Sequence, residues 1–419
     1  MNLVDRDRLF VWHPYTQMKT APPPLAIVRG QGVYLYTEDG RKLLDGISSW
    51  WVNIHGHSHP RLNEAIADQA KTLEHVIFAG ATHEPAVELA ERLVGILPAG
   101  LAKIFYSDNG STAVEVAVKM AIQYWRNQGQ RARDRIVALS HAYHGDTIGT
   151  MAVSAPSIFT EAFSSLLFPV DRVAPADVDS HLQQHGDRVA AVLVEPMLQG
   201  ASGMIMWPAE SLARIREACY RHGVLLIADE VLTGFGRTGR MFACEHAAVS
   251  PDICCLSKAL TGGYLPLAAT AATNAVYDAF LSDDRSKTFF HGHSFTANPL
   301  ACAVALASLD LIEESRALER VGRLERQLRD GLSPLSSLPN VLDVRVLGGI
   351  GVVELKSEGG YLDHVGPLLY ATFLERGILL RPLGNVLYFM PPYVITDAEV
   401  DRVIQCIGDV VKGLPSRAT

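Results

Sequence analysis

The stretch Val224-Leu225-Leu226-Ile227-Ala228-Asp229-Glu230 is a short aliphatic run that ends in two carboxylates. An unbroken apolar run of this length is typical of a strand that is buried on both faces of a parallel sheet. A helical pattern precedes it from Pro208 to His222, and Gly223 is placed to end that helix. The stretch therefore predicts a helix–strand unit of an α/β sheet, with acidic side chains at the carboxyl end of the strand.

The same pattern recurs along the first two thirds of the chain, where apolar runs alternate with helical segments. One helix is predicted from Thr112 to about Asn127, because Thr112-Ala-Val-Glu115 has the residues of a capping box. Strands that alternate with helices favour an α/β layer with a largely parallel sheet. The other predicted strands are Lys103–Ser107, Arg135–Leu139, Ala190–Val194, Ile253–Leu256 and Leu267–Ala272.

Two terminal regions predict a second, smaller α+β unit. A long helical pattern runs from about Ala301 to Leu332, followed by short strand-like and helical segments up to Leu380. The first 60 residues carry a hairpin pattern, Val33–Tyr36 and Lys42–Leu44 around an Asp-Gly turn. We expect residues 1–60 to pack with the small domain, residues 61–304 to form the large domain, and residues 305–419 to form the small one.

Composition excludes several classes of protein. The 419 residues are 48% hydrophobic and carry a net charge of −8, with no basic block that would suit nucleic acid or an anionic membrane. No apolar run approaches the ~18 residues that span a bilayer, and the N-terminus lacks a signal-peptide core. The six cysteines form no C-x-x-C pair, so buried free thiols are expected. These features favour a soluble cytoplasmic protein.

Four polar groups follow four of the predicted strands. Asp108-Asn-Gly-Ser-Thr112 is a candidate anion site at a helix start, Asp229 a candidate partner for a cation, Lys258 a candidate amine nucleophile, and Tyr143 a candidate stacking ring. Taken singly, each has an ordinary structural alternative: a helix cap, a solvated strand end, a surface lysine and a loop tyrosine. Since the carboxyl ends of parallel strands meet at one crevice, we expect the four groups to lie together.

Together these groups suit pyridoxal phosphate, which needs an anion site for its phosphate, an acid for its ring nitrogen, and a lysine for its aldehyde. Two other interpretations are weaker. Gly234-Phe-Gly-Arg-Thr-Gly239 matches G-x-G-x-x-G, but it does not open a helix directly after the strand, as a dinucleotide site requires. His55-Gly-His-Ser-His59 has the residues of a metal site, yet no carboxylate or cysteine cluster joins it nearby, and we expect no metal.

The stretches Leu226–Gly239 and Ser257–Gly263 resemble the signature of the class III pyridoxal-phosphate-dependent aminotransferases of fold type I, and the resemblance covers nearly the whole chain. It implies a large domain with a mostly parallel sheet and a smaller α+β domain built from both termini. It also implies roles at the cofactor. Lys258 would bond to the aldehyde and move the proton, Asp229 would pair with the ring nitrogen, Tyr143 would stack on the ring, and the phosphate would be held by Gly110 and Ser111.

Within the class, Trp12–Met18, Asp45–Trp51 and Arg381–Asn385 followed by Met390–Tyr393 resemble the members that aminate 8-amino-7-oxononanoate in biotin synthesis. This resemblance implies S-adenosylmethionine as the amino donor and Arg381 as the clamp for the substrate carboxylate. The other residues implied on the substrate side are Tyr15, Trp50, Trp51, Tyr143 and Tyr393, with Asp146 and Arg237 in support.

The resemblance further implies a homodimer in which Gly292, His293 and Ser294 reach the active site of the partner subunit. His293-Ser294 departs from the Pro-Thr of familiar members; the hydroxyl is kept, but the identity of the donor stays open, with lysine as an alternative. Another class III enzyme acting on ω-amino acids is the first rival interpretation. A pyridoxal-phosphate-binding regulator without turnover is the second, and it would bring a basic DNA-binding module, which does not precede Tyr15.

Overall fold

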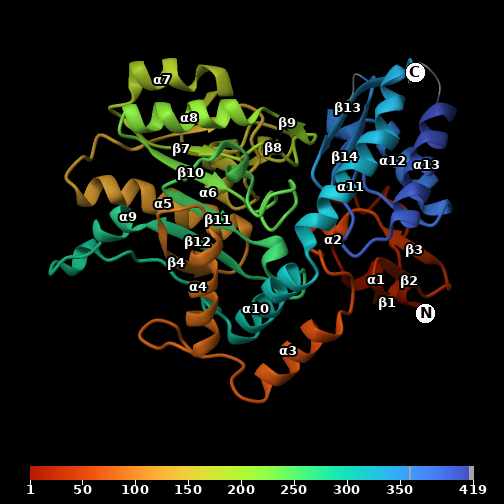
Figure 1. Ribbon diagram of the computed structural model, residues 1–419, viewed down its shortest axis with the longest axis horizontal. Helices are drawn as coiled ribbons and strands as arrows, with labels where there is room; N and C mark the ends of the chain where they lie inside the picture. The colour runs from red at the N-terminus through yellow and green to blue at the C-terminus, as the bar shows by residue number, and fades with distance from the viewer. Residues whose placement is uncertain (358–359, 415–419) are drawn as a thin grey trace.

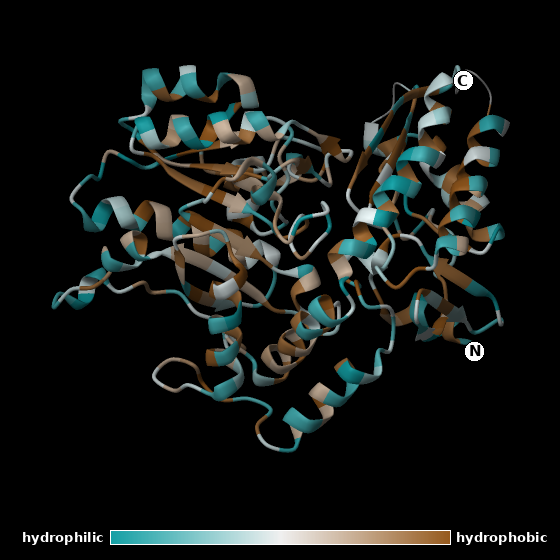
Figure 2. Cartoon of the chain, in the orientation of Figure 1, coloured by the Kyte–Doolittle hydropathy of each residue, from teal (hydrophilic) through white to brown (hydrophobic). Residues whose placement is uncertain are grey.

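The computed structural model describes residues 1–357 and 360–414. Figure 1 shows two lobes, a larger one built around a twisted sheet and a smaller one to which both the N-terminal and the C-terminal segments of the chain contribute. The strands of the large sheet are among the most hydrophobic segments, whereas the helices that cover it alternate polar and apolar residues (Figure 2). The burial of apolar strands beneath amphipathic helices is what holds an α/β layer together.

The large sheet has the strand order β4-β12-β11-β10-β7-β5-β6. Only β12 runs antiparallel to its neighbours, so the carboxyl ends of the other strands share one edge. The predicted α/β class with a mostly parallel sheet is therefore confirmed. The strands are β4 (Leu101–Ser107), β5 (Arg135–Leu139), β6 (Asp171–Val173), β7 (Val189–Val194), β10 (Leu225–Asp229), β11 (Ile253–Leu256) and β12 (Ala268–Thr273).

Helices cover both faces of this sheet, which explains why its strands are apolar at every position. In β7, Leu193 belongs to the core cluster of α5 (Gly110–Asn127), whereas its neighbours Val192 and Val194 belong to the cluster beneath α8 (Ala209–Arg221). Helix α7 (Val178–His185) packs alongside α8 on that second face. All six residues of β7 are buried as a result.

The small lobe joins the two ends of the chain in one sheet of order β1-β2-β3-β15, in which Leu44 of β3 pairs with Ile378 of β15. A second sheet of order β13-β14-β16 packs under α11 and is part of the same core as α12 and α13. The elements are β1 (Ile27–Gln31), β2 (Tyr34–Thr37), β3 (Lys42–Asp45), α11 (Ala317–Leu332), β13 (Val341–Leu347), β14 (Ile350–Leu355), α12 (Val365–Glu375), β15 (Ile378–Leu379), β16 (Val386–Phe389) and α13 (Asp397–Gly413).

The remaining elements connect and flank the two lobes. A short two-stranded ribbon, β8 (Leu198–Gln199) and β9 (Ile205–Met206), follows β7. The helices are α1 (Leu3–Phe10), α2 (Ser48–Trp51), α3 (Pro60–Ala70), α4 (Glu84–Ile96), α6 (Ile148–Val153), α9 (Asn274–Asp278) and α10 (Pro299–Glu314). The 3₁₀ turns are η1 (Glu161–Leu166), η2 (Pro175–Asp177), η3 (Ala243–Ala247), η4 (Lys258–Thr261), η5 (Arg285–Lys287), η6 (Ser333–Ser337) and η7 (Gly360–Leu362).

Two predicted helix boundaries were wrong. Helix α5 begins at Gly110 with Asn109 as its N-cap, because the Asn109 side chain accepts the Thr112 amide while the Thr112 hydroxyl accepts the Asn109 amide. The long helix expected from Ala301 to Leu332 is two helices, α10 and α11, separated at Arg316, whose φ is +50°. A left-handed residue cannot continue a right-handed helix, so the chain turns there.

The domain boundaries stay predictions. Helix α10 continues across position 304/305, and the final residues 415–419 of the predicted small domain lie outside the described residues. Among the residues that the structure describes, no helix has the length and apolar character needed to cross a membrane.

Candidate active site

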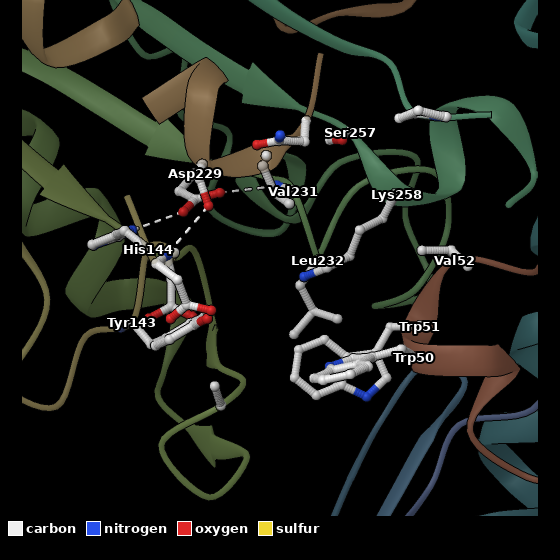
Figure 3. A pocket seen from close by; sticks show the side chains of 18 of the residues that line it. Trp50, Trp51, Val52, Tyr143, His144, Asp229, Val231, Leu232, Ser257 and Lys258 are labelled. Atoms are coloured by element: carbon white, nitrogen blue, oxygen red, sulfur yellow. Dashed lines mark hydrogen bonds and ion pairs between the residues drawn. The ribbon is translucent and has the colours of Figure 1, made fainter. Parts of the chain in front are cut away.

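A pocket of about 700 Å³ opens at the carboxyl edge of the large sheet and extends towards the small lobe. It collects the groups that follow β4, β5, β10 and β11, as the parallel sheet predicts. Figure 3 shows Lys258 reaching into this space from one side, with Asp229, His144 and Tyr143 on the other and the Trp50–Trp51 pair beside it. The pocket also includes residues from the C-terminal part of the chain, among them Arg381 and Tyr388.

One wall of the pocket is the N-terminus of α5, where Gly110 and Ser111 lie. The free N–H groups of a helix N-terminus favour an anion. The backbone here is packed too closely for side chains: a Cβ on Gly110 would lie 2.6 Å from Val231 Cγ1, and one on Gly145 would lie 2.0 Å from Ser111 Oγ. Gly145 also has a φ of +133°, which favours glycine. The arrangement forms a close-fitting cradle for a group such as phosphate.

Asp229 lies at the end of β10 with its carboxylate buried. Its Oδ1 accepts the Val231 amide at 3.1 Å, and its Oδ2 is 2.7 Å from Nδ1 of the buried His144. These two contacts fix the carboxylate in one orientation. A fixed, buried carboxylate in a pocket can hold a proton on a facing ring nitrogen.

One residue, Ser257, separates Lys258 from the end of β11. Lys258 has a φ of +46°, which is rare for a residue other than glycine. Its Nζ lies 4.6 Å from the centre of the Trp51 ring. Burial, against the opposing charges of Asp229 and Glu195 and with a smaller contribution from Arg237, lowers the pKa of Lys258 to about 8. A lysine with this pKa supplies a neutral amine far more readily than a surface lysine does.

Two tyrosines and a carboxylate form a hydrogen-bonded group at the pocket mouth. The hydroxyls of Tyr15 and Tyr143 are 3.1 Å apart, and Tyr15 also donates to Asp146. Burial, followed by the bond to Asp146, raises the pKa of Tyr15 to about 12, and burial raises the pKa of Tyr143 well above its usual range. Both hydroxyls therefore keep their protons and act as hydrogen-bond donors at the mouth.

The side of the pocket away from the sheet is aromatic and ends in a cation. Arg381 Cζ lies 4.4 Å from the ring centre of Trp50 and 5.9 Å from that of Tyr15. Trp51 is buried, and its indole Nε1 donates to Tyr388 Oη at 3.0 Å. A guanidinium held on aromatic faces is well placed to bind a carboxylate through two hydrogen bonds.

Five of the residues predicted for the site do not line the pocket. Arg237 is fully buried behind it, where its guanidinium donates to the carbonyls of Trp51 and Pro391. Tyr393 is buried too, and its hydroxyl donates to the carbonyl of Phe235. The other three, Gly292, His293 and Ser294, lie in the loop before α10.

His293 contacts the cradle from its outer side. Its Nδ1 is 3.1 Å from Asp108, the residue before the N-cap of α5, and its Nε2 is 3.1 Å from Nε2 of His291. Lys119 Nζ donates to the other nitrogen of His291 at 2.8 Å. Since a lysine ammonium only donates, the first two hydrogen bonds run from Lys119 through His291 to Nε2 of His293, whose Nδ1 lies beside the Asp108 carboxylate.

The sequence predicted no role for several pocket residues, and three of these contact residues that it did predict. His144 fixes Asp229, Val231 packs against Gly110, and Glu195 accepts the amides of Tyr143 and Gly200. Burial raises the pKa of Glu195 to about 7. Glu195 was recognisable, because it directly follows the predicted strand Ala190–Val194. His144 carried no signal of its own, because its partner Asp229 lies 85 residues away.

Two of the three histidines of the H-x-H-x-H stretch, His55 and His57, form hydrogen bonds with different partners. His55 is buried with Nε2 on the Ser308 hydroxyl at 3.0 Å, and burial lowers its pKa to about 3. His57 Nε2 lies 3.0 Å from Asp45. Across residues 1–357 and 360–414, no group of His, Cys, Asp and Glu side chains has the arrangement of a metal site.

Comparisons with known proteins agree with this geometry. The class-III aminotransferase family model matches residues 15–411. A curated protein of Synechococcus elongatus, named adenosylmethionine-8-amino-7-oxononanoate aminotransferase, is 50% identical over 96% of this chain and 98% of its own length. The protein of the same name from Geobacter sulfurreducens is 45% identical over 96% of this chain and 95% of its own.

A solved structure supports the same assignment. The crystal structure of adenosylmethionine-8-amino-7-oxononanoate aminotransferase from Methanocaldococcus jannaschii superposes with a TM-score of 0.95, at 38% identity and with 98% of each chain covered. The family match extends over most of the chain and includes every element that lines the pocket. The chain therefore belongs to the class-III aminotransferase family.

Proposed function

We propose that this aminotransferase carries pyridoxal phosphate and transfers an amino group from S-adenosylmethionine to 8-amino-7-oxononanoate, giving 7,8-diaminononanoate for biotin synthesis. The observation that supports this most is the continuity of one pocket from Lys258, past Trp50 and Trp51, to Arg381. The similar proteins from Synechococcus and Geobacter carry both compounds in their names.

The residues present fit pyridoxal phosphate at four points. The helix N-terminus at Gly110 and Ser111, which has no room for a further Cβ, suits the phosphate. Asp229 would hold a proton on the ring nitrogen, and Lys258 would bond to the aldehyde carbon. Tyr143, at the pocket wall, would stack on the ring.

The chemistry divides between the cofactor and the chain. When bound, pyridoxal phosphate accepts the electron pair left on carbon as a C–H bond of the substrate breaks. Lys258, displaced by the donor amine, takes that proton and returns it to another carbon, and its pKa of about 8 suits a base that must also act as an acid near neutral pH. Asp229 keeps the ring nitrogen protonated throughout, because His144 and the Val231 amide hold its carboxylate in place.

The two half-reactions exchange an amino group for a keto group. In the first, the α-carbon of the donor gives up its nitrogen, which the cofactor would carry, and takes an oxygen from water, so that the donor becomes a keto acid. In the second, the same nitrogen bonds to carbon 7 of the acceptor, whose keto oxygen leaves as water. The acceptor is a long aliphatic chain with a terminal carboxylate, so Trp50 and Trp51 would pack along its methylenes while Arg381 binds the carboxylate.

We also propose a homodimer in which the loop of Gly292, His293 and Ser294 completes the site of the partner subunit. Ser294 is exposed in this chain and outside its own pocket, so its hydroxyl is free to reach the phosphate of a neighbour. A cytoplasmic location is supported by the six cysteines, all buried and unpaired, because free thiols persist in reducing compartments.

A donor panel tests the proposed function. Purified protein loaded with pyridoxal phosphate would be given 8-amino-7-oxononanoate with S-adenosylmethionine, lysine or an ω-amino acid, and the products would be identified by mass spectrometry. We expect diaminononanoate with S-adenosylmethionine and none from Lys258→Ala.

Other outcomes would change the proposal in definite ways. If diaminononanoate forms only with lysine, then lysine rather than S-adenosylmethionine is the amino donor. Turnover of ω-amino acids with no amination of 8-amino-7-oxononanoate would make the protein another class-III aminotransferase. No turnover of any pair would leave a cofactor-binding protein without this activity.

A further inference from the structure

The Trp50–Trp51 pair is presented by an unusual backbone. Ser48, Ser49, Trp50 and Trp51 have φ values of +50°, +45°, +69° and +73°, so α2 is one turn of left-handed helix. The turn is closed by ordinary backbone bonds, from the Trp51 amide to the Ile47 carbonyl at 2.9 Å and from the Val52 amide to the Ser48 carbonyl at 3.0 Å. None of the four residues is glycine, and each carries an energetic cost in this region.

Such a backbone persists only where its surroundings fix it. The carboxylate of Asp45 lies at the start of the turn, fully buried, at the end of β3. It accepts the amides of Ile47 and Ser49 at 3.3 and 3.0 Å and the Ser49 hydroxyl at 2.8 Å. A buried carboxylate needs several hydrogen-bond donors, and Asp45 receives two from Ser49 in the turn and one from Ile47 just before it.

The fourth donor is His57, whose Nε2 lies 3.0 Å from Asp45 Oδ2. The other ring nitrogen, Nδ1, accepts the side-chain amide of Asn53 at 3.1 Å, so Nε2 carries the proton that is donated to Asp45. At the other end of the turn, Arg237 donates to the Trp51 carbonyl at 3.0 Å. Neither Asp45 nor His57 lines the pocket, so both act through the tryptophans.

We propose that Asp45 and His57 are positioning residues for the acceptor: they hold the left-handed turn that aims Trp50 and Trp51 into the pocket. Trp50 carries Arg381 on its face and Trp51 faces the Lys258 amine, so the turn sets the wall between the reacting amine and the carboxylate clamp. This role rests on the proposed function. It assigns acceptor binding, rather than cofactor binding, to a buried Asp–His pair outside the pocket.

The first test is kinetic and uses Asp45→Asn, which keeps the size of the side chain but replaces one acceptor oxygen with a donor. We expect the KM for 8-amino-7-oxononanoate to rise about tenfold or more. Cofactor loading and the rate of the donor half-reaction should change less than about twofold. Asp171→Asn is the matched control, because Asp171 also pairs with a histidine, His181, at 3.3 Å but lies away from the pocket.

The second test does not depend on activity. The chain has five tryptophans, so protein labelled with fluorotryptophan gives one ¹⁹F resonance for each residue, and single Trp→Phe variants assign them. We expect Asp45→Asn and Ser49→Ala to shift or broaden the resonances of Trp50 and Trp51, while those of Trp12, Trp125 and Trp207 stay in place. Asp171→Asn should leave Trp50 and Trp51 unchanged.

The two tests separate failure of the inference from failure of the proposed function. If the wild-type protein makes no diaminononanoate, the proposed substrate is wrong, but the ¹⁹F result still stands. Unmoved Trp50 and Trp51 resonances, or a change that falls equally on cofactor loading and acceptor KM, would overturn the positioning role. If Asp45→Asn does not fold, Ser49→Ala, which removes only the hydroxyl donor, decides the same question.

Discussion

At the scale of single residues, the pocket depends on how burial changes the protonation of Lys258. Its amine is mounted after a fully buried strand and faces an indole ring, so water that would stabilise the ammonium is excluded. Asp229 and Glu195 oppose this effect without cancelling it, and the pKa falls to about 8. Because the pKa of Lys258 is lower in the folded protein than in the unfolded chain, the free energy of unfolding depends on pH.

The cofactor-free protein should become more stable as the pH rises from about 8 to about 10.5, relative to Lys258→Met. In that window the unfolded chain still holds a proton that folded Lys258 has lost, so folding has to release this proton, and its release costs less free energy as the pH rises. Urea unfolding of both proteins at several pH values measures the difference. Lys19→Met, which replaces an exposed lysine in the same way, is the matched control. A flat difference for Lys258→Met would contradict the lowered pKa.

Arg381 is the second residue whose role can be isolated. Arg381→Lys keeps the charge but loses the planar fork and part of the contact with the Trp50 face. We expect the KM for the acceptor to rise about tenfold, equivalent to about 1.4 kcal/mol, with little change in the donor half-reaction. Steady-state and single-turnover kinetics separate the two effects. Arg376→Lys, on the surface outside the pocket, should behave like the wild type.

At the scale of elements, the start of α5 and the loop after β5 have to approach each other closely to form the cradle. Gly145 makes this possible, because any Cβ there would overlap Ser111. Asn109 then caps the helix by accepting the Thr112 amide, and the amides of Gly110 and Ser111, which line the pocket, stay available for the cradle.

Gly145→Ala should therefore weaken cofactor binding at least tenfold, because Ser111 must move away from the phosphate position. The dissociation of pyridoxal phosphate, followed by the loss of its absorbance on dialysis, measures the effect. Gly80→Ala is the matched control: Gly80 also has a positive φ of +90°, but a Cβ there meets nothing within 4 Å. If the two variants release the cofactor equally fast, backbone strain rather than the overlap with Ser111 is responsible.

At the scale of the whole molecule, the proposed dimer predicts that the loop at Ser294 acts on the partner subunit. Lys258→Ala and Ser294→Arg subunits should each be inactive alone, the first without its amine and the second with a bulky side chain in the neighbour's phosphate site. In a mixed dimer, the Ser294→Arg subunit keeps Lys258 and receives a normal loop from its partner. Mixing should therefore restore one active site in two.

Activity measured after co-expression and separation of the mixed dimers checks this prediction. No recovery would mean that Ser294 serves its own subunit, or that the chain does not dimerise, and sedimentation of the wild-type protein distinguishes these outcomes. If the Ser294→Arg protein is already active before mixing, the loop does not reach a phosphate.

Local patterns predicted the sheet and the groups at its edge, because each depends on a few consecutive residues. The apolar strands, the acid at the end of β10 and the lysine after β11 are all found where the sequence predicts them. Boundaries were less accurate, since the cap at Asn109 and the break at Arg316 depend on single side chains and single φ values. The part that could not be predicted is the set of contacts between distant segments.

The sequence by itself determined the chemistry: which acid, amine and aromatic ring stand at the ends of which strands. Only the tertiary structure decided how they are oriented. His144 meets Asp229 across 85 residues, and Trp51 meets Tyr388 across 337. The left-handed turn of α2 is likewise fixed by Asp45, His57 and Arg237, against the local preference of its own residues. Local preference follows from neighbouring residues, whereas a strained or buried polar arrangement depends on partners that packing brings from elsewhere in the chain.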